Sequence, residues 1–136
     1  DLIVGGINLK GGDPLNAPET KVGVAGSYDF EAGSIGVNLN ANYTWTSNTL
    51  FTDIGSANNL ASIWRRPSFG VANAAVNFSF ADDRYKLGIY VKNLFNKHYV
   101  AGLRRISGSV GGTGVVAQAL PRDFDRYVGG SLTVNF

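Results

Sequence analysis

The sequence has 136 residues, of which only 16% are charged, well below the roughly 25% typical of soluble domains. Cysteine and methionine are absent and histidine occurs once, which excludes a disulfide scaffold, a cysteine-based zinc site and a thiol nucleophile. The 12 Lys and Arg residues nearly balance the 10 Asp and Glu residues, and the net charge of +2 is too small to indicate a nucleic-acid-binding protein.

The chain begins at Asp1 without an initiator methionine, a basic n-region or an apolar h-region. We therefore expect that any signal peptide has been removed or lies outside this sequence, and that the sequence is a fragment of a longer protein. No run approaches the ~18 apolar residues that a membrane-spanning helix needs, which excludes a helical span within these residues.

Apolar and polar residues alternate with a period of two along most of the chain, which predicts β-strands. After a loop or strand end at 1–18, the predicted strands lie near 20–30, 34–47, 69–81, 85–94 and 126–136. In the third of these, the apolar positions change parity near Ala72 and Asn73, which predicts a bulge or a strand end. No segment has a helical stripe. We therefore predict an all-β fold, an antiparallel meander of about five long strands.

The connections between these strands alternate in length. Tight turns are predicted at 31–33 and 81–84, and long loops rich in Gly, Ser and Asn at 47–67 and 95–125. Loops longer than ~12–15 residues are uncommon in compact soluble domains, whereas a transmembrane β-barrel has short turns at one rim and long loops at the other. Five strands at ~4.8 Å spacing are too few to close such a barrel, so we expect an incomplete barrel wall.

Charged residues are nearly absent from the strand cores. The cores are 22–28, 35–46, 69–81, 85–92 and 127–136. Within them only Lys86 and Lys92 are charged, and the polar positions carry Asn, Gly, Ser and Thr. A solvent-exposed sheet face normally carries charged side chains that discourage edge pairing. The observed pattern favours a wide barrel in which the uncharged polar side chains face the lumen and the apolar side chains face lipid.

The aromatic residues form two groups. Phe30, Phe80 and Tyr85 lie beside the predicted short turns, and Tyr43 and Trp45 lie toward the long loops. At ~3.3 Å per residue and a tilt of ~45°, the strand between them rises about 23 Å, close to the ~25 Å apolar band of outer-membrane barrels. The alternative interpretation is that these aromatics cap the core of a soluble β-sandwich.

Three sequence elements resemble the TonB-dependent outer-membrane receptors. The segment Val91-Lys92-Asn93-Leu94-Phe95-Asn96-Lys97-His98-Tyr99 is similar to the family's V-x-N-L-F-(D/N)-K-x-Y element. Leu120-Pro121-Arg122, followed by an alternating strand that ends at Phe136, resembles the end of the family's barrel, and Asn16-Ala17-Pro18 is similar to its N-A-P. The family motif residues are Val91, Asn93, Leu94, Phe95, Asn96, Lys97, Tyr99, Pro121 and Arg122, to which we assign a structural role.

The resemblance implies that residues 1–136 are the C-terminal part of a receptor barrel in the outer membrane of a Gram-negative bacterium. The whole receptor is expected to import a nutrient, such as a ferric siderophore, haem, cobalamin or an oligosaccharide. Its expected partners are outer-membrane lipid and lipopolysaccharide, the barrel-assembly machinery, and the TonB system acting through a plug domain outside this sequence. The alternatives are a passive porin-type barrel and a soluble β-sandwich binding module.

The last strand has the pattern of a barrel-assembly signal. Outer-membrane barrels resemble one another in ending on an aromatic residue preceded by alternating apolar positions, and Phe136, Val134, Leu132 and Val128 fit this pattern. The alternative is that Phe136 only completes an aromatic belt at the membrane interface.

Two arginine pairs are the candidate ligand contacts in the long loops. Arg65-Arg66 and Arg104-Arg105 could bind an anionic ligand such as a ferric siderophore, because guanidinium groups pair well with carboxylates. The alternative, which we favour, is that they pair with lipopolysaccharide phosphates or loop carboxylates. A lone His98 makes neither a metal site nor a catalytic triad, so we predict no enzyme activity, no cofactor and no metal.

Overall fold

The computed structural model describes residues 3–4, 7–8, 16–51, 64–81, 83–106 and 115–135. These residues form strands and connections only. The strands are β1 Ile3–Val4, β2 Ile7–Asn8, β3 Lys21–Ala32, β4 Ile35–Thr46, β5 Thr49–Leu50, β6 Arg65–Arg66, β7 Phe69–Phe80, β8 Tyr85–Lys92, β9 Gly102–Ile106, β10 Val115–Ala119 and β11 Tyr127–Val134. Among the described residues, no helix is long and apolar enough to cross a membrane.

The chain divides into two compact units. The first combines Asp1–Lys21, Thr46–Phe69 and Tyr99–Pro121, and it contains the two-stranded sheets β1–β2, β5–β6 and β9–β10. The second combines Val22–Trp45, Gly70–His98 and Arg122–Phe136. It contains the single five-stranded sheet on which the candidate site lies.

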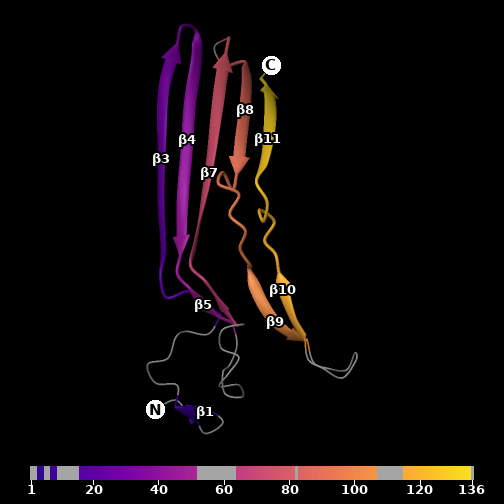
Figure 1. Cartoon of the computed structure of the whole chain (residues 1–136). Helices are drawn as coiled ribbons and strands as arrows, with labels where there is room; N and C mark the ends of the chain where they lie inside the picture. The colour runs from indigo at the N-terminus through magenta and orange to yellow at the C-terminus, as the bar shows by residue number, and fades with distance from the viewer. Residues whose placement is uncertain are drawn as a thin grey trace. The chain divides into compact units, whose positions relative to one another are not determined.

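The five-stranded sheet has the order β11-β8-β7-β4-β3, so the long strands lie beside one another in the order in which they occur along the chain (Figure 1). Strand β8 pairs antiparallel with β7 from Ala74↔Val91 to Phe80↔Tyr85, and with β11 from Tyr127↔Lys92 to Val134↔Tyr85. This sheet confirms the predicted all-β meander of five long strands, and it does not close into a barrel.

Tight turns connect the strand pairs at one end of the sheet. Gly33 between β3 and β4 has a φ of +67°, a conformation open to glycine at little cost and typical of the first central residue of a two-residue hairpin turn. Between β7 and β8, Ala81 and Asp83 also have positive φ, and the Arg84 amide donates to the carbonyl oxygen of Ala81 at 3.1 Å. Asn135, just after β11, donates its backbone N–H to Arg84 O at 2.9 Å and so holds the last strand to this turn.

The predicted loops contain strands that the sequence analysis did not identify. Strands β5 and β6 lie within 47–67, and β9 and β10 lie within 95–125, so the predicted long loops contain short strands of their own. Strands β9 and β10 pair over five residues, from Val115↔Ile106 to Ala119↔Gly102. The pairing satisfies backbone groups that a bare loop would leave to water. Likewise, β1 and β2 lie within the segment predicted as a loop or strand end.

The parity change predicted near Ala72 and Asn73 coincides with a shift in register, although β7 continues through it. The β7–β8 pairing begins at Ala74↔Val91. Beyond that point, the Leu94 amide donates to the carbonyl oxygen of Ala72 at 2.8 Å, one residue out of the register of the ladder. Asn93 lies between Val91, the last residue of β8 in register with β7, and Leu94. It has a φ of +51°, and this left-handed conformation accounts for the one-residue shift in register.

Alternation gives the five-stranded sheet one apolar and one polar face. The apolar side chains are largely exposed, including Tyr28 at 65%, Val128 at 68% and Leu132 at 71%.

Strand β3 is longer than its predicted core, so the long strands carry more charges than predicted. These charged residues are Lys21, Asp29, Glu31, Lys86 and Lys92. All of them have the parity of the polar face, which is the distribution expected of a wall between lipid and a polar lumen.

Candidate binding face on the polar side of the sheet

A row of amide side chains crosses the polar face from strand to strand. Asn38 of β4 donates from Nδ2 to Asp29 Oδ1 of β3 at 2.6 Å, and Asn77 of β7 donates from Nδ2 to Asn38 Oδ1 at 3.1 Å. Asn40 also donates to Asn38 Oδ1. Asn38 therefore links Asp29, Asn40 and Asn77 on the polar face, and these bonds hold the side chains of the row in fixed positions.

A second row lies nearer the long-loop end. Asn73 of β7 donates from Nδ2 to Asn42 Oδ1 of β4 at 2.8 Å, and its own Oδ1 accepts the backbone N–H of Asn93 at 3.0 Å. Since Asn93 directly follows β8, this row connects three consecutive long strands.

Two hollows lie on this polar face. The loop-end hollow has a volume of about 420 Å³ and includes Asn40, Asn42 and Asn73 in its lining. Tyr90, Lys92, Arg122 and Tyr127 complete its polar lining. The turn-end hollow, of about 640 Å³, includes Asp29, Glu31, Asp83 and Lys86. The charged residues that line the loop-end hollow are thus both cations, whereas three of the four that line the turn-end hollow are acids.

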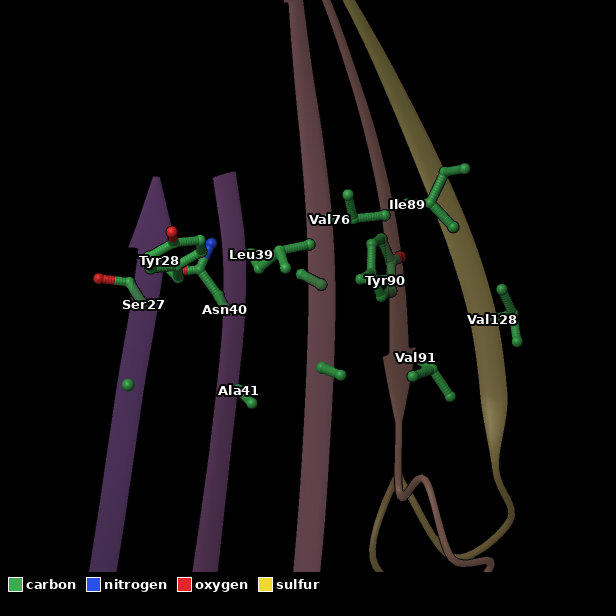
Figure 2. Close-up of a pocket in the computed structure, with 13 residues that line it drawn as sticks. Ser27, Tyr28, Leu39, Asn40, Ala41, Val76, Ile89, Tyr90, Val91 and Val128 are labelled. Atoms are coloured by element: carbon green, nitrogen blue, oxygen red, sulfur yellow. The ribbon is translucent and has the colours of Figure 1, made fainter. Parts of the chain in front are cut away.

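A third hollow, of about 660 Å³, lies on the apolar face (Figure 2). Leu39, Val76, Ile89 and Val128, which come from β4, β7, β8 and β11, contribute to its lining. Aliphatic side chains of this kind offer few groups that could orient a polar ligand. They suit a surface that contacts hydrocarbon, so the candidate binding face is the polar one.

Asn93 lies at the centre of the connection after β8 and is 0% exposed. Its Nδ2 faces three carbonyl oxygens, those of Lys97 at 3.0 Å, Asp123 at 2.9 Å and Phe124 at 3.1 Å. Its Oδ1 accepts the backbone N–H of Lys97 at 2.7 Å. The side chain therefore closes the turn after β8 and joins it to the segment that leads into β11.

The other residues of the motif have separate environments. The Asn96 Oδ1 accepts the Arg126 N–H at 2.8 Å, which adds a second connection to the β11 side. Phe95 is 72% exposed and Leu94 is half-buried. The ring of Tyr99, in the first unit, stacks on Phe69 with centroids 4.1 Å apart. Val91 lies on the apolar face and Pro121 is half-buried.

A family model described as the TonB dependent receptor-like β-barrel matches residues 3–94, more than half of the chain. The chain belongs to this family. Its members are receptors and transporters of the outer membrane, not enzymes, and the exposed apolar face of the sheet agrees with that setting. No curated protein and no solved structure matches the chain. The resemblance inferred from the motifs is therefore confirmed, and Val91, Asn93 and Leu94 lie inside the matched residues.

Arg66 is enclosed by other residues of the first compact unit. Its guanidinium group donates to Thr49 Oγ1 at 2.7 Å and to the carbonyl oxygen of Val100 at 3.2 Å. The same group lies 5.3 Å from the ring centroid of Phe51 and 4.7 Å from that of Phe69. These are distances at which a cation is attracted to an aromatic ring. Arg66 therefore holds two aromatic rings and two chain segments together.

The four candidate loop arginines are not equivalent. Burial lowers the pKa of Arg66, with an opposing contribution from Tyr99 that raises it, and the Arg66 Nε is buried with no hydrogen-bond partner among the described residues. Arg65 and Arg104 are exposed, while the side chain of Arg105 lies outside the described residues. The structure thus gives Arg66 a packing role that the sequence pattern did not reveal.

The proposed assembly-signal residues lie on the apolar side of β11. Val128 and Leu132 are more than two-thirds exposed, and Val134 is 37% exposed. Strand β11 has a neighbour, β8, on one side only, so it is an edge of the sheet. Phe136 lies outside the described residues.

His98 pairs with a carboxylate and an aromatic ring. Its Nε2 lies 3.0 Å from Asp125 Oδ1, and its ring stacks on Phe124 at 4.7 Å. Among the described residues, no group of three or more His, Cys, Asp or Glu residues could hold a metal ion. His98 therefore belongs to the packing of the segment before β11.

The sequence analysis missed the loop-end hollow. Period-two alternation already places Asn40 and Asn42 on one face of their strand. The partners from other strands, such as Asn73 and Tyr90, come together only through the register between strands. Register is set by pairing across the sheet and is not readable from a single strand.

Proposed function

We propose that this chain is part of the wall of an outer-membrane receptor that binds a scarce nutrient and imports it with energy from the TonB system. One observation supports this most directly: a single sheet exposes an apolar face and carries all the charges of its long strands on the other face. Such a sheet separates lipid from a polar interior.

We further propose that the receptor resides in the outer membrane of a Gram-negative bacterium, in contact with lipid and lipopolysaccharide. Coupling to the TonB system would act through a plug domain in the full-length protein. A ferric siderophore is one candidate nutrient, for which exposed Arg65 and Arg104 are candidate contacts, because guanidinium groups bind anionic oxygens.

Import is tested by following radiolabelled ferric siderophores and other labelled nutrients into cells that produce the full-length protein. We expect uptake that saturates with concentration and that stops when the TonB system is deleted or the proton gradient is collapsed. A matched strain without the protein provides the background. Uptake that does not saturate and survives loss of TonB would identify a passive porin instead, and recovery of the protein in the soluble fraction would point to a β-sandwich module.

The last strand supports a second expectation, that the barrel-assembly machinery reads Phe136 together with Val134, Leu132 and Val128. The exposed edge strand β11 carries the last three of these on its apolar face. Deleting Phe136 should reduce the amount of folded receptor in the outer membrane by about tenfold, since one missed recognition step worth ~1.4 kcal/mol has that effect. Membrane yield is measured by immunoblot of fractionated cells. A Phe136→Tyr control should retain most of the yield, and an unchanged yield after deletion would contradict this role.

A further inference from the structure

The loop-end hollow contains hydrogen-bonding groups that the described part of the chain does not use. Asn73 donates to Asn42 Oδ1, which fixes that amide and turns its Nδ2 group away from the bond. Asn40 donates through its Nδ2 to Asn38 and keeps its Oδ1 unpaired. Within the described residues, neither the Asn42 Nδ2 nor the Asn40 Oδ1 has a protein partner. The hollow therefore offers at least one donor and one acceptor in positions already set by the amide rows.

Two cations line the same hollow without a carboxylate. Lys92 is half-buried at the end of β8, and Arg122 is exposed in the segment before β11. Among the described residues neither forms an ion pair, whereas Lys86 at the other end of β8 lies 3.6 Å from Asp83. Lys92, which has lost part of its water without an ion pair among the described residues, therefore favours the binding of an anion, and Arg122 adds a second positive charge beside it.

Two tyrosines, Tyr90 and Tyr127, form part of the lining of the loop-end hollow. The rings of Tyr90 and Tyr127 lie 6.2 Å apart and at 89° to each other. Tyr90 covers Gly129 on the paired strand, where any side chain would collide with its ring. Within the described residues their hydroxyl groups make no hydrogen bond. Rigid rings with free hydroxyl groups suit a compact ligand that combines carbon surface with polar groups.

We propose that the loop-end hollow binds a hydroxycarboxylate, with the carboxylate between Lys92 and Arg122 and the hydroxyl groups on Asn40, Asn42 and the tyrosine hydroxyls. A neutral polyol would leave the two cations without a counter-charge, and a bare inorganic anion would leave the amides unused. This inference rests on the proposed import function and names the chemistry of the cargo. Sugar acids and the ferric complexes of hydroxycarboxylic acids both combine carboxylate and hydroxyl groups. The probes used in the test distinguish these two classes of ligand.

The test is isothermal titration calorimetry on the detergent-solubilised full-length protein. The probes are digalacturonate, ferric citrate, maltose as a neutral sugar, and inorganic phosphate as an anion without hydroxyl groups. We expect digalacturonate or ferric citrate to bind, and whichever binds identifies the source. Lys92→Gln should weaken that binding by about tenfold or more, since a charge-assisted hydrogen bond is lost. Asn42→Ala should weaken it by about fivefold, as expected for a neutral hydrogen bond.

Lys86→Gln is the matched control, because Lys86 lies on the same face of β8 but in the turn-end hollow. It should leave the affinity unchanged. If Lys92→Gln reduces the heat-modifiable, folded form of the barrel on gels, Arg122→Gln tests the same contact from an exposed position outside the strands.

Four outcomes would overturn the proposal: no binding of either hydroxycarboxylate, equal binding of maltose, equal binding of phosphate, or an unchanged affinity in both cation variants. Binding is measured without transport, so its failure is separable from failure of the proposed function. A receptor that imports another nutrient in a TonB-dependent way but ignores these probes refutes only the hydroxycarboxylate site. Binding without uptake refutes only the import.

Discussion

Replacing Asn93 by alanine should destabilise the folded protein by about 3–5 kcal/mol, the range found when a buried hydrogen-bonded network is broken. The side chain is fully buried and meets four backbone groups, the N–H of Lys97 and the carbonyls of Lys97, Asp123 and Phe124. Alanine would leave these groups without their partner. It would also have to adopt the left-handed φ of +51°, which costs about 1 kcal/mol more for a residue with a Cβ than for glycine.

Two further substitutions at this position separate the causes. Asn93→Gly removes the same hydrogen bonds but tolerates the positive φ, so it should be about 1 kcal/mol less destabilising than alanine. Asn93→Asp retains an acceptor for the Lys97 N–H but turns a carboxylate toward carbonyl oxygens, so it should be at least as destabilising as alanine. The measurement is the free energy of unfolding in urea of the full-length protein in lipid vesicles.

Asn96→Ala is the control from the same motif. Asn96 also has a φ of +51°, but it is exposed and its side chain makes one bond, to the Arg126 N–H. Its loss should cost about 1–2 kcal/mol. An Asn93→Ala protein as stable as Asn96→Ala would show that the contacts of Asn93 do not hold the β8 and β11 segments together.

Asn93 also illustrates what sequence can and cannot predict. Its motif was identifiable because nine consecutive residues fit a family pattern. The contacts with Asp123 and Phe124, thirty and thirty-one positions further along the chain, depend on how the chain returns to the sheet. Local residue patterns carry no information about such a return.

The long strands were predictable because a period of two over eight to twelve residues is a strong signal. The pairs β5–β6 and β9–β10 were not, since strands of two to five residues are too short to establish a period. Ile106 and the valines at 115 and 116 do flank a glycine-rich segment, which is a hairpin signal. The high glycine content led instead to the prediction of a loop. The enclosure of Arg66 was not predictable from the sequence either, because the two rings that lie against it, Phe51 and Phe69, come from separate segments.

The assignment of one face to lipid leads to the second large expected effect. Arginine at Leu39 should destabilise the membrane-embedded protein by about 2–4 kcal/mol, the cost of this residue on the lipid face near the bilayer midplane. Leu39 lies near the middle of β4, is 42% exposed, and lines the apolar hollow with Val76 and Ile89 (Figure 2). Unfolding in urea from lipid vesicles measures the loss, with Leu39→Ala separating the lost apolar area from the added charge.

The matched control is Ser27→Arg, on the neighbouring strand β3 and with the parity of the polar face, where Lys21, Asp29 and Glu31 also lie. An arginine there faces water or polar groups and should change the free energy of unfolding by less than about 1 kcal/mol. If both faces met water, as in a soluble sheet, the two arginines would have similar small effects. If the apolar face were the core of a sandwich, the Leu39→Arg penalty would persist in a detergent-free soluble protein. Only a lipid-facing wall predicts a large difference between Leu39 and Ser27 that depends on the bilayer.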